Sequence, residues 1–135
     1  MCMKVREIKP TSEELRVMLE TGFILREAAD FEAAARVFQG CIEFMPESEV
    51  PLVGLGTVYL QKGDFDAALI TCKSAKEVNP TSNYAKVHYA EALLFQKKRE
   101  EAENELRQII ETSPDSTYSR TAKRLLEAAD MITSN

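Results

Sequence analysis

The chain has 135 residues, 44% of them hydrophobic, which is enough to bury the core of one domain. Its net charge of -5 and its scattered basic residues exclude the concentrated basic face that nucleic-acid binding needs. Three cysteines without metal-ligand spacing, beside one histidine, predict reduced thiols in the cytoplasm and exclude a disulfide framework or a metal site.

Residues 1–11 are expected to form a loose N-terminal arm. Charged residues interrupt the arm at Lys4, Arg6 and Lys9, so it lacks the apolar run of a signal peptide. No stretch of about 20 apolar residues occurs anywhere, and we expect no membrane span. The pattern Thr11-x-x-Glu14 resembles a capping box and predicts that the first helix starts near Ser12.

A period of 34 residues organises the middle of the chain, because Pro46, Pro80 and Pro114 are equally spaced. Aligning the chain on these prolines brings three alanines into register, which are Ala34, Ala68 and Ala102. A second column holds the small residues Gly22, Gly56 and Ala90. Small side chains let two helices approach closely, and a proline ends the second helix of each pair. Each period therefore predicts two antiparallel helices.

The last helix is expected over about 116–131, with Asp115 or Ser116 as its cap and a tail over 132–135. Apolar residues recur in it at helical spacing, at Tyr118, Ala122, Leu125, Ala129 and Ile132. The opposite face carries Arg120, Lys123, Arg124 and Glu127. A helix with one polar face is what a repeat array needs at its exposed end. We predict a single domain over 12–131, with repeats at about 15–48, 49–82 and 83–116.

The repeated columns resemble the tetratricopeptide repeat family, whose signature is W-x2-L-G-x2-Y…A-x3-F…P. The second repeat is the most similar and reads Leu52-x2-Leu55-Gly56-x2-Tyr59, then Ala68-x3-Cys72, then Pro80. The resemblance extends from Leu15 to Ser116. It implies an all-α superhelix of antiparallel helix pairs with one concave surface.

Residues suited to catalysis are few, and we predict that the protein is not an enzyme and has no catalytic residue, cofactor or metal. His88 has no neighbouring set of carboxylate and nucleophile in the sequence. Cys41 and Cys72 fall in or beside core columns and are expected to be buried packing thiols, whereas Cys2 lies in the arm. The run Gly54-Leu55-Gly56 lies inside a predicted helix and lacks the lysine of a phosphate-binding loop.

The resemblance implies that a ligand lies against the first helices of the repeats, which line the concave surface. The residues carried over to that surface are Arg16, Leu19, Phe23, Arg26, Val50, Val53, Thr57, Leu60, Tyr84, Val87, His88, Glu91 and Leu94. Most are apolar, which predicts a groove for an amphipathic or hydrophobic segment of a partner protein. The alternative is that some of these side chains pack against each other or under the last helix.

Some members of the family clamp a carboxylate terminus with lysine, asparagine and arginine. Leu19 and Phe23 stand where the clamp's lysine and asparagine would be in the first repeat, and Tyr84 and His88 replace basic residues in the third. This pattern argues against such a clamp. In size, charge and groove the chain is similar to the small chaperones of bacterial type III secretion, which implies sequestration of a needle subunit or translocator. A general scaffold or assembly adaptor, and an accessory domain of an enzyme, are the alternatives, and the oligomeric state is left open.

Overall fold

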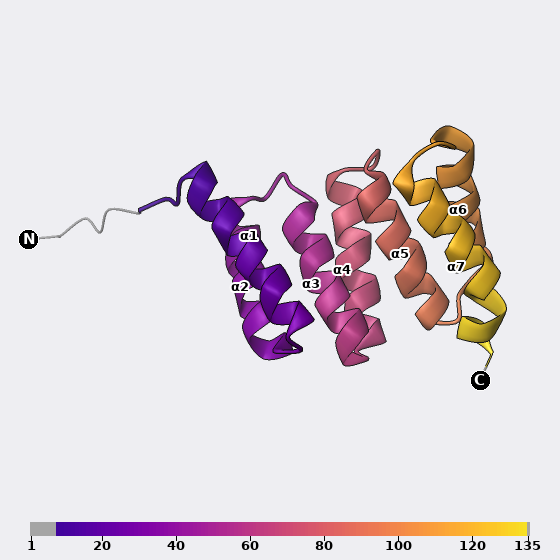
Figure 1. The fold of residues 1–135 in the computed structure, drawn as a ribbon, viewed down its shortest axis with the longest axis horizontal. Helices are drawn as coiled ribbons and strands as arrows, with labels where there is room; N and C mark the ends of the chain where they lie inside the picture. The colour runs from indigo at the N-terminus through magenta and orange to yellow at the C-terminus, as the bar shows by residue number, and fades with distance from the viewer. Residues whose placement is uncertain (1–7, 135) are drawn as a thin grey trace, which may run out of the picture.

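A computed structural model of the chain describes residues 8–134, and these form seven α-helices joined by short turns. The helices are α1 (Ser12–Glu27), α2 (Phe31–Phe44), α3 (Val50–Lys62), α4 (Phe65–Val78), α5 (Asn83–Phe95), α6 (Arg99–Thr112) and α7 (Thr117–Thr133). They stand side by side in a row from α1 to α7 (Figure 1). The all-helical arrangement predicted from the sequence is confirmed. The predicted thiol Cys2 and most of the predicted arm lie outside the described residues.

Side chains that accept hydrogen bonds from backbone amides fix several helix starts. The Thr11 hydroxyl accepts from the Glu14 amide at 3.1 Å, and the Glu14 carboxylate accepts from the Thr11 amide at 3.4 Å. The predicted capping box is therefore confirmed. Asp30, Asp64 and Ser116 cap α2, α4 and α7 in a similar way, each accepting from the amide three residues further on.

The spaced prolines lie just after the second helix of each pair. The helices α2, α4 and α6 each end two residues before Pro46, Pro80 and Pro114, respectively. The residue before a proline is disfavoured in the helical conformation, so the chain turns there into the next pair. The repeated proline thus sets the length of each second helix.

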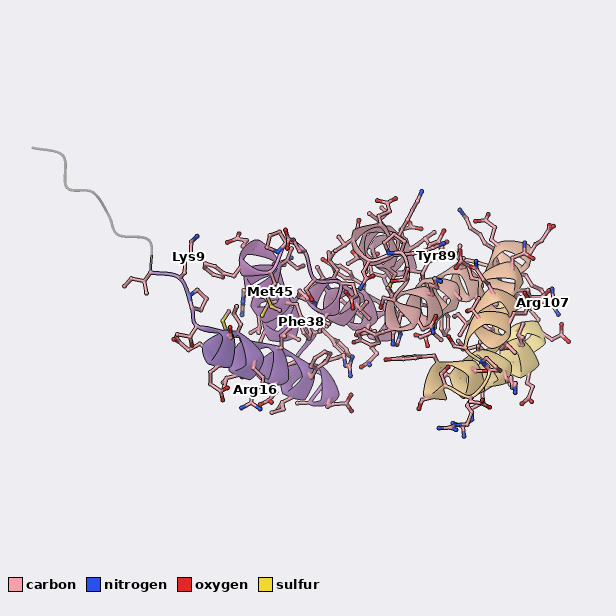
Figure 2. All side chains as sticks on the ribbon, turned by 90° about the horizontal axis from the view of Figure 1, so that it is seen from above. Lys9, Arg16, Phe38, Met45, Tyr89 and Arg107 are labelled. Atoms are coloured by element: carbon pink, nitrogen blue, oxygen red, sulfur yellow. The ribbon has the colours of Figure 1, made fainter. Side chains whose placement is uncertain are left out.

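The helices alternate between two layers. Each odd-numbered helix contacts the next odd-numbered helix, whereas no two of α2, α4 and α6 have backbones in contact within the described part of the chain. Because the odd-numbered helices lie closer together, the stack curves and these helices line its concave side. Seen from above, α1 and α7 lie along one edge and the middle helices are set back from them (Figure 2).

Glycines allow the closest contacts between the helices. The ring of Phe38 is fully buried, and a Cβ atom would lie 2.8 Å from it on Gly22 and 2.5 Å from it on Gly54. A Cβ on Gly56 would lie 2.5 Å from the sulfur of Cys72. The interior has no room for these atoms, so each glycine is required by packing. Figure 2 shows Phe38 between the helices of the first repeat.

The last helix closes the array as the sequence predicts. Its apolar side includes the buried residues Ala122 and Ala129, and Tyr118, Leu125 and Ile132 pack against the same cluster. The outward residues are exposed, and they are Arg120, Lys123, Arg124 and Glu127. The helix continues to Thr133, past the expected end near residue 131, because Ile132 still packs on the core. Among the described residues, no helix has both the length and the apolar character needed to cross a bilayer.

Candidate binding face

The structure divides the residues predicted for the concave groove into buried and accessible ones. Val53 and Leu94 are 0% exposed, Val87 is 3% exposed and Leu60 is 9% exposed. Successive odd-numbered helices approach so closely that the side chains between them are covered by their neighbours. At these four positions the structure matches the alternative to a groove: the side chains pack against each other and offer no surface to a partner.

Arg26 is the accessible residue with the most specific contacts. Its Nη1 donates to the hydroxyl of Thr57 on α3 at 2.7 Å, and its Nη2 donates to Glu27 at 3.0 Å. The guanidinium lies 5.2 Å from the ring centroid of Phe23. Phe23 in turn meets the buried ring of Phe38 edge to face, with centroids 5.0 Å apart. These contacts fix a cation and an aromatic ring beside each other on α1.

A second group of side chains gathers on α5 and α7. The ring of Tyr84 meets the ring of His88 edge to face at 5.2 Å and approaches that of Tyr118 on α7 at 6.4 Å. His88 Nδ1 lies 3.9 Å from a carboxylate oxygen of Glu91. Burial raises the pKa of Tyr84, and the positive charge of Arg26 opposes that rise. The field of Arg26 therefore extends to the second group.

Tyr118 was assigned to the core of the last helix by the sequence analysis, and its place beside Tyr84 was missed. The signal was present, because Tyr118 follows Pro114 at the distance at which Tyr84 follows Pro80. The helix α7 thus occupies the place of a first helix in a further repeat. We define the concave face by the accessible or half-buried residues Leu19, Phe23, Arg26, Tyr84, His88, Glu91 and Tyr118.

The two remaining predicted residues lie near the starts of their helices. Arg16 on α1 is exposed and pairs with Glu13 and Glu20 of the same helix, as an ordinary surface arginine does. Val50 is half-buried at the start of α3, where its amide donates to Ser48 at 3.2 Å. Among the described residues, no hydrogen bond or ion pair joins either residue to the Arg26 or Tyr84 group.

The two cysteines that the structure describes are poorly suited to nucleophilic chemistry. Cys41 and Cys72 are free thiols and fully buried, as predicted. Burial raises the pKa of Cys72 to about 12, and the carboxylate of Glu91 adds to that rise. A thiol needs its deprotonated form to react, so Cys72 is unreactive near neutral pH. Among the described residues, no group of three or more histidine, cysteine, aspartate or glutamate side chains is placed to hold a metal ion.

A pocket of about 230 Å³ lies apart from the concave face, where α4 meets α5. Its lining residues are Lys73, Lys76, Glu77, Pro80 and Tyr89. Lys76 pairs with Glu105 of α6 and lies 5.0 Å from the ring centroid of Tyr89. The pocket shares no residue with the concave face.

Comparison with known proteins places this geometry in a family. Two family models, both described as tetratricopeptide repeat, match residues 25–88 and 84–116. The chain belongs to the tetratricopeptide repeat family. Scaffolds of this family are typically non-catalytic. No curated protein sequence matches the chain significantly.

Several solved tetratricopeptide structures are similar across nearly the whole chain. The type III secretion chaperone SycD of Yersinia enterocolitica, solved with a peptide of the translocator YopD, is 22% identical over 92% of this chain and 98% of that chain, with a TM-score of 0.75. The first such domain of Spaghetti (RPAP3), bound to an HSP90 peptide, is 19% identical over 94% and 99%, with a TM-score of 0.75. The TPR2B domain of yeast Sti1, in complex with Hsp70, is 20% identical over 88% and 95%, also with a TM-score of 0.75. At these identities the likeness establishes the fold.

Proposed function

We propose that the protein binds a segment of a partner protein on its concave face. The observation that carries the proposal is that half-buried aromatic rings occur on three helices of that face, with Phe23 on α1 and the neighbouring rings of Tyr84 and Tyr118 on α5 and α7. Aromatic side chains are enriched at protein interfaces because they bury much area and lose little conformational entropy. The rings lie on several helices, so one bound segment crosses more than one repeat.

The concave face suits an amphipathic or hydrophobic segment. Its rings offer apolar contact, and its charged groups Arg26 and Glu91 are half-buried on different helices. Leu19 and Phe23 occupy the positions of the lysine and asparagine of a carboxylate clamp in the first repeat, and Tyr84 and His88 replace basic residues in the third. The proposed ligand is therefore an internal stretch of a chain with several apolar side chains.

The test uses a phage-displayed library of random peptides about 16 residues long, a length that spans several turns of helix. Peptides selected on the wild-type protein are measured by fluorescence polarisation against Tyr84→Glu and, separately, Tyr118→Glu. The matched control is Ile70→Glu, because Ile70 is an apolar residue that is 68% exposed on the outer helix α4. Circular dichroism checks that every variant is folded.

We expect a carboxylate introduced on the concave face to weaken the binding of the selected peptides by about tenfold or more, because the bound peptide would cover that carboxylate with apolar groups. The control should bind them as the wild type does. The proposal is overturned if the library yields no binding peptide. It is also overturned if the folded Tyr84→Glu and Tyr118→Glu variants bind at full strength while Ile70→Glu does not.

A narrower role follows from the same face, as a chaperone of type III secretion that keeps an apolar helix of a needle subunit or translocator covered in the cytoplasm. The likeness to SycD supports this role only through the fold, since domains that bind HSP90 and Hsp70 peptides have equal TM-scores. Co-purification of the protein with its partner from the source organism decides between a secretion chaperone and a general scaffold. A secreted protein encoded beside a secretion apparatus supports the chaperone, and a stable assembly of other proteins supports a scaffold.

A further inference from the structure

Arg26 differs from an ordinary surface arginine in the way its guanidinium is held. Only 18% of its side chain is exposed, whereas the side chain of Arg36 on α2 is 69% exposed and pairs with Glu32. The hydroxyl of Thr57 donates to the carbonyl of Gly54 at 2.8 Å, so its oxygen is turned to accept from Arg26. Thr57 is itself 5% exposed. The cation is thus oriented before any partner arrives, which lowers the entropy cost of using it.

The guanidinium retains donors that its contacts leave unused, because Nη1 and Nη2 carry two N–H groups each and each nitrogen donates to one partner. Arg26 Nε is buried and has no hydrogen-bond partner in the described structure. A buried donor on a charged group is costly to leave unpaired, more so than a neutral one. Glu27, which balances the charge through Nη2, is 71% exposed, so solvent and salt screen the pair strongly. Positive charge therefore remains on the concave face, together with the second N–H group of Nη1 and of Nη2.

The other charged group on the face does not neutralise Arg26. The Glu91 carboxylate lies 3.9 Å from His88 Nδ1, and no ion pair within 4.0 Å joins it to Arg26 among the described residues. On one side Arg26 borders the ring of Phe23, and its field extends to Tyr84. The guanidinium is therefore flanked by aromatic side chains.

We propose that the partner segment carries an aspartate or glutamate side chain that accepts from Nη1 and Nη2 of Arg26, with apolar neighbours covering Phe23 and Tyr84. This inference rests on the proposed function and specifies the partner's chemistry. An ionised carboxylate matches the planar edge of a guanidinium and forms stronger hydrogen bonds there than a neutral acceptor does. The partner's carboxylate belongs to a side chain within the segment. A chain terminus would require a group of basic residues, whereas this face offers a single fixed cation, Arg26.

The test selects the same random peptide library in parallel on the wild type, on Arg26→Gln and on the control Arg36→Gln. We expect peptides selected on the wild type and on the control to share an acidic residue at a constant spacing from their apolar residues. Peptides selected on Arg26→Gln should keep the apolar residues and lose the acid. Replacing the acid of a selected peptide with its amide should weaken its binding to the wild type by about tenfold, and to Arg26→Gln by less than about twofold.

The outcomes separate this inference from the proposed function. If wild-type peptides bind without a shared acid, or if the amide exchange leaves their affinity for the wild type unchanged, the Arg26 inference is overturned and the proposed function stands. If no peptide binds, both fail. The amide exchange needs only the wild-type protein, so it decides the question even if Arg26→Gln does not fold. Thr57→Val adds a further arm, because loss of the hydroxyl releases Arg26 and should reduce the preference for the acid.

Discussion

Gly54→Ala should destabilise the protein although it replaces a poor helix former with a good one. Taken alone, the exchange in the interior of α3 should stabilise the helix by about 1 kcal/mol. The new Cβ would, however, lie 2.5 to 2.8 Å from three atoms of the Phe38 ring. Overpacking of this kind costs about 1–3 kcal/mol. The ring is fully buried and cannot retreat, because Gly22 of α1 confines it from another side, so we place the cost at the upper end.

The expected net loss in the free energy of unfolding is about 2 kcal/mol, measured by urea unfolding followed by circular dichroism. Gly40→Ala is the matched control, since it makes the same exchange inside α2 where the nearest atom, in Met18, is 3.7 Å away. Gly40→Ala should stabilise the protein by up to about 1 kcal/mol. In a Phe38→Leu background, Gly54→Ala should become neutral or stabilising. The reasoning is refuted if Gly54→Ala matches or exceeds the wild type in stability.

Two further predictions concern the core. Ala68→Leu should destabilise by about 1–3 kcal/mol, because Ala68 is 0% exposed between paired helices, and an unchanged urea midpoint would contradict this packing. The pKa of Cys72 is raised from its ordinary value of 9.0 to about 12, so between these values the unfolded chain releases a proton that the folded chain keeps. Between pH 9 and 12 the free energy of unfolding should therefore fall by about 1.4 kcal/mol per pH unit from Cys72 alone. In Cys72→Ala, measured under reducing conditions, this contribution to the pH dependence should vanish. Parallel curves of stability against pH for the two proteins would rule out the raised pKa.

Local signals allowed the fold to be predicted from the sequence. The capping box at Thr11 and the breaks before Pro46, Pro80 and Pro114 depend on residues within a few positions of each other, and the structure confirms them. Cys72 is buried where the repeat column places it. A periodic array repeats such local signals, so each one supports the others.

The candidate site was only partly predictable, because exposure depends on how closely successive repeats approach. Val53, Val87 and Leu94 occupy inward positions by register, yet neighbouring helices cover them. The hydrogen bond from Arg26 to Thr57 joins residues 31 positions apart and has no local signal. Tyr118 could have been found by extending the 34-residue period past Pro114. Which residues of the concave face contact a partner stays a prediction.

The polar outer surface of α7 sets a limit on what the concave face can hold. A further repeat stacked on α7 would take water from the exposed residues Arg120, Lys123, Arg124 and Glu127, which disfavours such stacking. The inner layer of the described residues consists of the four helices α1, α3, α5 and α7. Neighbouring helices pack about 9 Å apart, which gives the layer a width of about 27 Å across its three spacings. That width is crossed by an extended strand of about 8 residues or by a helix of about 18 residues. A segment of that length covers the four inner helices of the described residues, and the rest of a longer partner lies beyond them.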